Sequence, residues 1–104
     1  MESLKKSQLF KQVYNHRRSV ANRLLVLYIY RNDVGFSRLG ISVSKKIGCA
    51  VVRNRVKRLI KENLRLFNIS TGYDIVVVAR PAAAESDFHQ IGASLSKLLD
   101  RHNI

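Results

Sequence analysis

The apolar residues between Leu24 and Ser44 recur at a spacing of two, which is the pattern of β-strands. From Leu24 to Tyr30 two sets of side chains alternate, with Val26, Tyr28 and Tyr30 on one face and Leu25, Leu27 and Ile29 on the other. From Arg38 to Ser44 a second alternation separates Leu39, Ile41 and Val43 from Gly40, Ser42 and Ser44. Typical turn residues lie between the two segments, so we expect a hairpin connection through Asn32, Asp33 and Gly35.

Three other segments repeat their apolar residues at helical spacing. A first helix is predicted from about Ser7, a candidate N-cap, to His16, with an apolar face of Leu9, Phe10, Val13 and Tyr14. A second is predicted from about Ala50 to Phe67, with a core face of Val52, Val56, Leu59, Ile60 and Phe67. A third follows the candidate N-cap Asp87 and carries the apolar stripe Ile91, Leu95, Leu98 and Leu99.

The segment from Tyr73 to Pro81 contains a continuous β-branched run, which predicts a central strand buried on both faces. The resulting order, α-β-β-(β)-α-β-α, predicts the α+β class, with helices packed against a small sheet in a two-layer sandwich. The length of 104 residues fits one domain spanning residues 1–104. The strands before and after the second helix should be parallel, either as neighbours or with one strand between them.

Positive charge is concentrated in the first two thirds of the chain. The formal net charge is +12, and residues 1–70 hold sixteen Lys and Arg against three Asp and Glu. Residues 71–104 hold three basic and four acidic side chains. A field of this size indicates a polyanionic partner, either nucleic acid or an anionic membrane.

The second predicted helix separates this charge from its core face. On a helical wheel, one narrow stripe nearly opposite the core holds Asn54, Arg58, Lys61 and Arg65. Lys57 lies beside the stripe, whereas Arg53 and Arg55 flank the two edges of the core face. Like charges three and four residues apart destabilise an isolated helix, and only Glu62 offsets them, so a partner that neutralises them is indicated.

Nucleic acid is the better candidate of the two polyanions. A membrane-surface helix needs an outward apolar face, whereas this helix uses its apolar face for the core. Arginine favours bidentate contacts with phosphate, and Asn54 could bind a base edge, a sugar or a phosphate. Aromatic side chains that could stack on unpaired bases, or pack in the core, are Phe10, Tyr14, Tyr28 and Tyr30.

No set of residues has the spacing of a protein catalyst or a metal site. The histidines, His16, His89 and His102, have no carboxylate at motif spacing, and the acidic residues are scattered. The single cysteine, Cys49, allows no internal disulfide or cysteine-based zinc site and favours a reduced, cytoplasmic compartment. The N-terminus lacks a signal-peptide pattern, and the longest apolar run, Leu24 to Tyr30, is too short to span a membrane.

The stretch "SVSKKIGCAVVRNRVKRLIKE", from Ser42 to Glu62, resembles the signature of the protein subunit of bacterial ribonuclease P. Its characteristic Arg-Asn-Arg block followed by Lys-Arg is matched by Arg53, Asn54, Arg55, Lys57 and Arg58. The segments "LFKQVY", "SVANRLLVLY" and "DIVVVARPAAA" agree as well, so the resemblance covers nearly the whole chain. Lys61 stands where arginine is usual in this family.

The resemblance implies a fold and a function that residue patterns do not supply. It implies a left-handed βαβ crossover, as in a domain of a small-subunit ribosomal protein, against the usual right-handed rule. It implies that the conserved block, with Lys61 and Arg65, contacts the catalytic RNA of ribonuclease P. A cleft between the first helix and the sheet would take the 5′ leader of precursor tRNA, with Phe10, Tyr14, Tyr28, Ser42, Lys45 and Lys46 lining it and Arg53 at its border.

In this family the RNA subunit cuts the phosphodiester bond and holds most of the Mg²⁺, while the protein assists by neutralising and positioning. The partners implied are therefore the catalytic RNA and precursor tRNA, with no membrane, no small-molecule substrate, and no catalytic or metal-binding residue on the protein. Two other classes share the basic charge. A ribosomal component would share the RNA partner, and a DNA-binding regulator would use the second helix for recognition, although no helix-turn-helix pairing precedes it.

Overall fold

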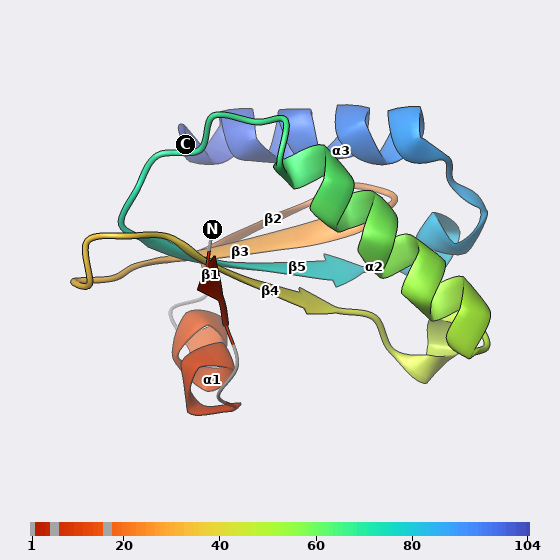
Figure 1. Ribbon diagram of the computed structural model, residues 1–104, viewed down its shortest axis with the longest axis horizontal. Helices are drawn as coiled ribbons and strands as arrows, with labels where there is room; N and C mark the ends of the chain where they lie inside the picture. Colours follow the sequence, from red (N-terminus) through yellow and green to blue (C-terminus); the bar gives the residue numbers. More distant parts are fainter. Residues whose placement is uncertain (1, 5–6, 16–17) are drawn as a thin grey trace.

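A single mixed sheet organises the protein (Figure 1). The computed structural model describes residues 2–4, 7–15 and 18–104, and within them five strands pair in the order β1-β4-β5-β3-β2. The strands are β1 (Glu2–Ser3), β2 (Ser19–Ala21), β3 (Leu25–Arg31), β4 (Arg38–Ser42) and β5 (Tyr73–Ala79). The α-helices are α1 (Ser7–Asn15), α2 (Ala50–Leu64) and α3 (Phe88–His102), and two short 3₁₀ helices are η1 (Lys45–Ile47) and η2 (Pro81–Glu85).

The strand β5 lies at the centre of the sheet, parallel to β4 and antiparallel to β3. Its residues Ile75, Val76 and Val77 are fully buried, which confirms the central strand predicted from the β-branched run. The predicted hairpin between β3 and β4 is wrong, because β5 is inserted between them. Burial explains this order, since the strand that is apolar on both faces takes the position where both faces are covered.

The connection from β3 to β4 is shaped by Asn32 instead of a tight turn. The Asn32 side-chain amide donates to the carbonyl oxygen of Phe36 at 3.1 Å and to Asp74 Oδ1, on β5, at 2.8 Å. Asp74 is fully buried and forms an ion pair with Arg38 at 2.7 Å. This network joins the end of β3 to β4 and β5, with β5 lying between the other two strands.

The two faces of the sheet differ in how fully they are covered. The helices α2 and α3 pack on one face and form the sandwich, whose core includes Leu27, Ile29, Ile60, Ile75 and Leu95. On the opposite face α1 gives a partial cover, and a smaller cluster forms around Leu4, Val13 and Val76. Alternation on β3 is confirmed, because Leu25, Leu27 and Ile29 belong to the α2–α3 side and Tyr28 and Tyr30 to the α1 side. The alternation from Arg38 to Ser44 is confirmed as well, because Leu39, Ile41 and Val43 pack with the α2–α3 core and Gly40 faces Phe10.

The crossover from β4 through α2 to β5 is left-handed. In Figure 1 both strands point to the right, α2 lies above them, and β4 is nearer the viewer than β5. Seen from the helical side with the strands pointing upward, the chain therefore moves to the left. This confirms the uncommon handedness that the family resemblance implied.

The helices follow the predicted apolar stripes, with differences at their ends. The α3 capping box is present, since the backbone N–H of Gln90 donates to Asp87 and the Gln90 side chain accepts from the Asp87 N–H. The helix α2 ends at Leu64, three residues before the predicted end at Phe67, in a tighter turn. The predicted end of the first helix, His16, lies outside the described residues.

Several elements carry no clear sequence signal. The short strands β1 and β2 and the helices η1 and η2 were not predicted. The core face predicted for the second helix also omitted Asn63, which is buried between α2 and α3. Its side-chain amide donates to the carbonyl oxygens of Leu59 at 2.9 Å and Phe88 at 3.0 Å. Within the described part of the chain, no helix is long and apolar enough to cross a membrane.

Candidate nucleic-acid interface

The outward surface of α2 carries the predicted basic stripe. Its side chains are exposed and line a shallow depression of about 320 Å³, formed by Asn54, Lys57, Arg58, Lys61, Glu62 and Arg65. Arg58 and Glu62 are 3.9 Å apart and are 64% and 48% exposed, so this ion pair adds little to stability. The surface therefore keeps its positive charge available for an external anion.

Arg55 differs from the rest of the Arg-Asn-Arg block. Its side chain is half-buried and donates to two backbone carbonyl oxygens, that of Ala84 at 3.2 Å and that of Ser86 at 2.6 Å. These bonds tie α2 to η2 and to the residue that follows it. Two of the guanidinium nitrogens are therefore used inside the protein, and Arg55 positions the basic helix.

Further groups that attract anions lie at the N-terminal end of α2. The Arg53 side chain is half-buried, and its buried Nε has no hydrogen-bond partner in the described part of the structure. Cys49 is the N-cap residue; its side chain forms no capping hydrogen bond, but the nearby backbone N–H groups of Val52 and Val51 lower the pKa of its exposed thiol. A helix N-terminus with an adjacent arginine favours anions.

Three aromatic side chains meet between α1 and the sheet. The rings of Tyr14 and Tyr28 are 4.9 Å apart and nearly perpendicular, and those of Phe10 and Tyr14 are 6.4 Å apart. Burial raises the pKa of Tyr14, and the nearby Ser42 side chain on β4 opposes this rise. All three rings are only partly buried, so the structure brings the predicted cleft residues together with surface still open.

Gly40 sets how closely α1 approaches the sheet, a feature that sequence reasoning missed. A Cβ atom at this position would lie 2.5 Å from Cζ and 2.7 Å from Cε1 of Phe10. Only glycine lets the Phe10 ring lie directly on β4. The glycine within the strand alternation was the available signal, because an isolated glycine in a strand often marks a close approach.

The basic residues Lys45 and Lys46 follow β4 in the short helix η1 and are exposed. Ser42 is the last residue of β4, so this positive charge lies just beyond the strand end that carries the Tyr14 contact. The strand that carries Gly40 and Ser42 beneath α1 thus leads directly into two exposed cations. That combination of ring faces and cations suits a single-stranded nucleic acid.

The described histidines form no cluster with acidic residues. His102 Nε2 lies 3.1 Å from the carbonyl oxygen of Leu27, and the His89 ring packs against Phe88. The third histidine, His16, lies outside the described residues. Within the described chain, no three His, Cys, Asp or Glu side chains come close enough together to hold a metal ion.

The sequence model of the family described as Ribonuclease P matches residues 1–103. The chain belongs to the ribonuclease P protein family. It is 52% identical over 98 residues to the ribonuclease P protein component of Thermoanaerobacter sp. (strain X514), an alignment that covers 92% of this chain and 84% of the relative. It is 48% identical to that of Clostridioides difficile (strain 630), covering 99% of this chain and 93% of the relative.

Solved ribonuclease P proteins have the same fold. The Staphylococcus aureus protein is similar with a TM-score of 0.90 at 39% identity, covering 100% of this chain and 97% of that one. The Thermotoga maritima protein gives a TM-score of 0.86 at 33% identity, covering 97% of each chain. As a ribonuclease P protein component, this chain is part of a tRNA-processing ribonucleoprotein and has an RNA partner.

Proposed function

We propose that this ribonuclease P protein binds the catalytic RNA through α2 and the 5′ leader of precursor tRNA through the cleft beneath α1. In this arrangement it assists the endonucleolytic removal of the leader that gives mature tRNA 5′ ends. The observation that carries the proposal is the separation of two RNA-compatible surfaces by the sheet. One is the basic outer face of α2, and the other is the cluster of partly exposed aromatic rings beneath α1, on the opposite face of the sheet.

The α2 surface has the chemistry of a phosphate-binding site. Four exposed cations along one side, Lys57, Arg58, Lys61 and Arg65, would replace the counterions of an RNA backbone. The exposed Asn54 side chain adds a polar group for a sugar or base edge. Arg53 and Arg55 would contribute at the edges, Arg53 by the exposed part of its half-buried side chain and Arg55 by fixing the helix to η2.

The cleft has the chemistry of a single-strand site. Exposed parts of the rings of Phe10, Tyr14 and Tyr28 can stack on bases without reading their sequence, which suits leaders that differ among tRNAs. Ser42 supplies a hydroxyl inside the cleft, and Lys45 and Lys46 supply charge for the leader phosphates. Duplex RNA would not present its base faces to these rings.

The proposal gives the chemical step to the RNA subunit. That subunit would hold most of the Mg²⁺ and cut the bond, leaving a 5′-phosphate on the tRNA. The protein residues would hold the leader and reduce the repulsion between two RNA molecules. Less Mg²⁺ would then be needed for the two RNAs to approach each other.

Reconstitution tests this function. The protein is added to a bacterial ribonuclease P RNA at a Mg²⁺ concentration at which the RNA alone is inactive, and cleavage of precursor tRNA is followed. Restored cleavage at the mature 5′ end is expected. Lys97→Ala, a change of an exposed cation on α3, is the matched control and should restore cleavage equally. Failure of the unaltered protein to restore cleavage would contradict the proposal.

A further inference from the structure

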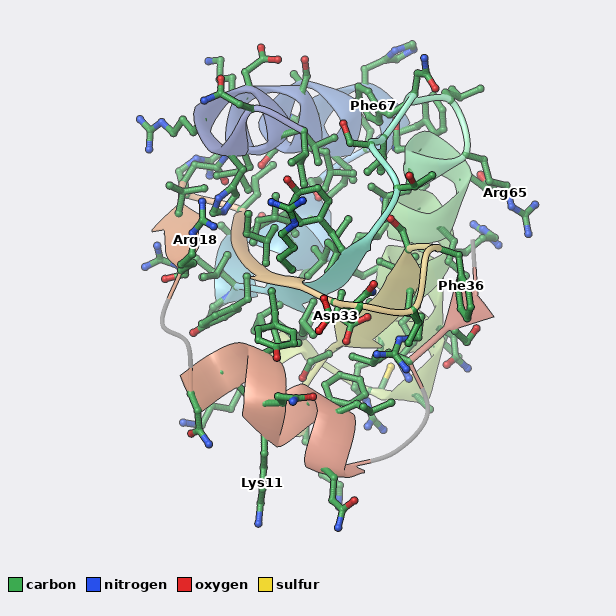
Figure 2. The ribbon with its side chains drawn as sticks, turned by 90° about the vertical axis from the view of Figure 1, so that its left-hand side faces the viewer. Lys11, Arg18, Asp33, Phe36, Arg65 and Phe67 are labelled. Carbon is green, nitrogen blue, oxygen red and sulfur yellow. The ribbon has the colours of Figure 1, made fainter. Side chains whose placement is uncertain are left out.

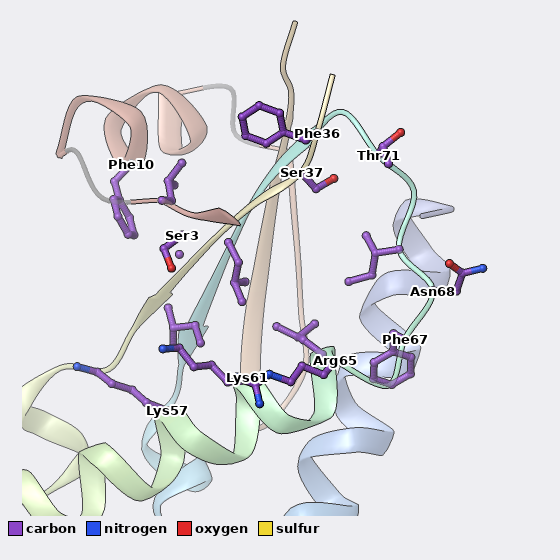
Figure 3. A pocket seen from close by; sticks show the side chains of 16 residues that line it. Ser3, Phe10, Phe36, Ser37, Lys57, Lys61, Arg65, Phe67, Asn68 and Thr71 are labelled. Atoms are coloured by element: carbon purple, nitrogen blue, oxygen red, sulfur yellow. The ribbon is translucent and has the colours of Figure 1, made fainter. Parts of the chain in front are cut away.

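A groove of about 900 Å³ lies at the edge of the sandwich, between β4 and the C-terminal half of α2 (Figure 3). We call it the edge groove. On the α2 side it is lined by Lys57, Lys61 and Arg65, which extend toward the sheet. On the sheet side it is lined by Phe10, Phe36 and Leu39. Neither the predicted stripe nor the aromatic cleft accounts for Phe36 or for the apolar wall.

The backbone of Phe36 is held in place, while the residue is 45% exposed. Its carbonyl oxygen accepts from the Asn32 amide, which is fixed in turn by the Arg38–Asp74 ion pair. The next residue, Ser37, donates to the carbonyl oxygen of Ser70 at 2.9 Å, which ties this wall to the loop that follows α2. Figure 2 shows Phe36 and Arg65 on the same side of the molecule, away from Lys11 on the outer face of α1. An exposed aromatic ring on a fixed backbone suits a planar partner.

The charge of the edge groove selects an anionic partner. Three cations line one wall, and no Asp or Glu is among the residues that line the described groove. A short single-stranded RNA segment meets both requirements, since one of its bases has a π face for Phe36 and its phosphates can pair with Lys61 or Arg65. We propose that the edge groove takes unpaired nucleotides of the catalytic RNA, with a base against Phe36. This proposal rests on the function proposed above and names the RNA element that α2 binds.

An added peptide strand fits the edge groove less well than RNA. The edge of β4 is already occupied by β1, through the pairs Glu2↔Arg38 and Ser3↔Leu39, and the Leu4 N–H donates to the Leu39 carbonyl oxygen at 2.7 Å. A peptide could add to this part of the edge only by displacing β1. A base inserted beside the apolar wall needs no such displacement.

The leader of precursor tRNA is also a less suitable occupant. Phe10 lies on Gly40 and lines the edge groove, and its ring is also 6.4 Å from that of Tyr14 in the aromatic cluster beneath α1. A leader in the cleft would have to cross this ring to reach Phe36. The cations of the edge groove, in contrast, belong to α2, the helix proposed to bind the catalytic RNA.

Phe36→Ala is the decisive variant, and Val34→Ala is its matched control. Both side chains are 45% exposed and lie on the same loop, but only Phe36 lines the edge groove. Binding of a bacterial ribonuclease P RNA is measured by filter binding over a range of salt concentrations, without precursor tRNA. We expect Phe36→Ala to bind about tenfold more weakly, the loss of one base–aromatic stack, and Val34→Ala to bind normally. Phe36→Tyr, which keeps the ring, should also bind normally.

The salt dependence and a chemical footprint separate the possible outcomes. Phe36→Ala should keep the wild-type salt slope, because no phosphate contact is removed. In the complex with wild-type protein, one or more unpaired bases of the RNA should be shielded from dimethyl sulfate. In the complex with Phe36→Ala, the same bases should be modified. Normal RNA affinity and an unchanged footprint for Phe36→Ala would overturn the edge-groove proposal, while an effect confined to complexes with leader-bearing tRNA would assign the groove to the leader. Absence of RNA binding by the wild-type protein would instead reject the function proposed above.

Discussion

The rings of Tyr14 on α1 and Tyr28 on β3 meet edge to face, 4.9 Å apart at an interplanar angle of 83°. The two residues are fourteen positions apart in the sequence and come from elements of different periodicity. Their contact fixes α1 over the open face of the sheet. It also leaves part of each ring exposed in the cleft proposed for the leader.

Tyr28→Ala should weaken the binding of precursor tRNA by the reconstituted ribonucleoprotein by about tenfold, because a base stacked on an aromatic side chain contributes about 1–3 kcal/mol. Mature tRNA, which lacks the leader, should bind as it does with wild-type protein. Tyr28→Phe keeps the ring and should keep the affinity. Equal weakening for precursor and mature tRNA would contradict the proposal that this cleft binds the leader.

Arg58→Ala should weaken the binding of ribonuclease P RNA and reduce the slope of log affinity against log salt by about one, since one phosphate contact is lost. Stability to urea should change by less than about 0.5 kcal/mol, because Arg58 is exposed and its pair with Glu62 is 3.9 Å long. Lys97→Ala on α3 is the matched control and should leave the slope unchanged. The α2 assignment fails if both variants change the slope alike.

Arg55→Ala should destabilise the protein by about 1–3 kcal/mol, because the carbonyl oxygens of Ala84 and Ser86 lose a charged donor. Arg55→Lys should recover little of this loss, since a single ammonium group does not reproduce the guanidinium fork. Urea denaturation measures both effects. If Arg55→Ala is as stable as wild type, its side chain does not hold α2 to η2 in solution.

Gly40→Ala should displace Phe10, because the new Cβ would lie 2.5 Å from its ring carbon Cζ. The cleft and the edge groove share this wall, so we expect weaker binding of both precursor tRNA and the catalytic RNA. The clash should also lower the stability of Gly40→Ala. The double variant Gly40→Ala with Phe10→Leu relieves the clash, so it should be more stable than Gly40→Ala but should still bind the leader weakly. Unchanged binding by Gly40→Ala would show that the position of Phe10 is not critical.

Cys49 should react with iodoacetamide at lower pH than an ordinary cysteine. Its pKa is lowered by the nearby backbone N–H groups of Val52 and Val51, at the start of α2, and by the charge of Arg53. A lowered pKa means that the reactive thiolate is present at pH values where a free thiol is still protonated. The midpoint of the pH–rate curve should therefore rise when the protein is unfolded in urea, and an unchanged midpoint would contradict the N-cap geometry.

The sequence determined much of the local structure because the physical signals were local. The alternation of Leu25, Leu27 and Ile29 with Tyr28 and Tyr30 predicted β3 and its two faces. The Asp87 cap and the apolar stripe of α3 were also confirmed. The basic stripe of α2 could be read in the same way, since residues at helical spacing share a face wherever the helix lies.

Only the tertiary structure decided which elements became neighbours. Turn residues between β3 and β4 suggested a hairpin, but β5 is the strand that must be buried on both faces, and it took the central place. The same insertion brought Asp74 to Asn32 and Arg38 and so fixed Phe36 beside α2. The close approach of Phe10 to Gly40, the internal bonds of Arg55 and the edge groove likewise depend on contacts between distant segments. Spacing along a chain determines the face on which a residue lies, whereas three-dimensional packing decides what that face meets.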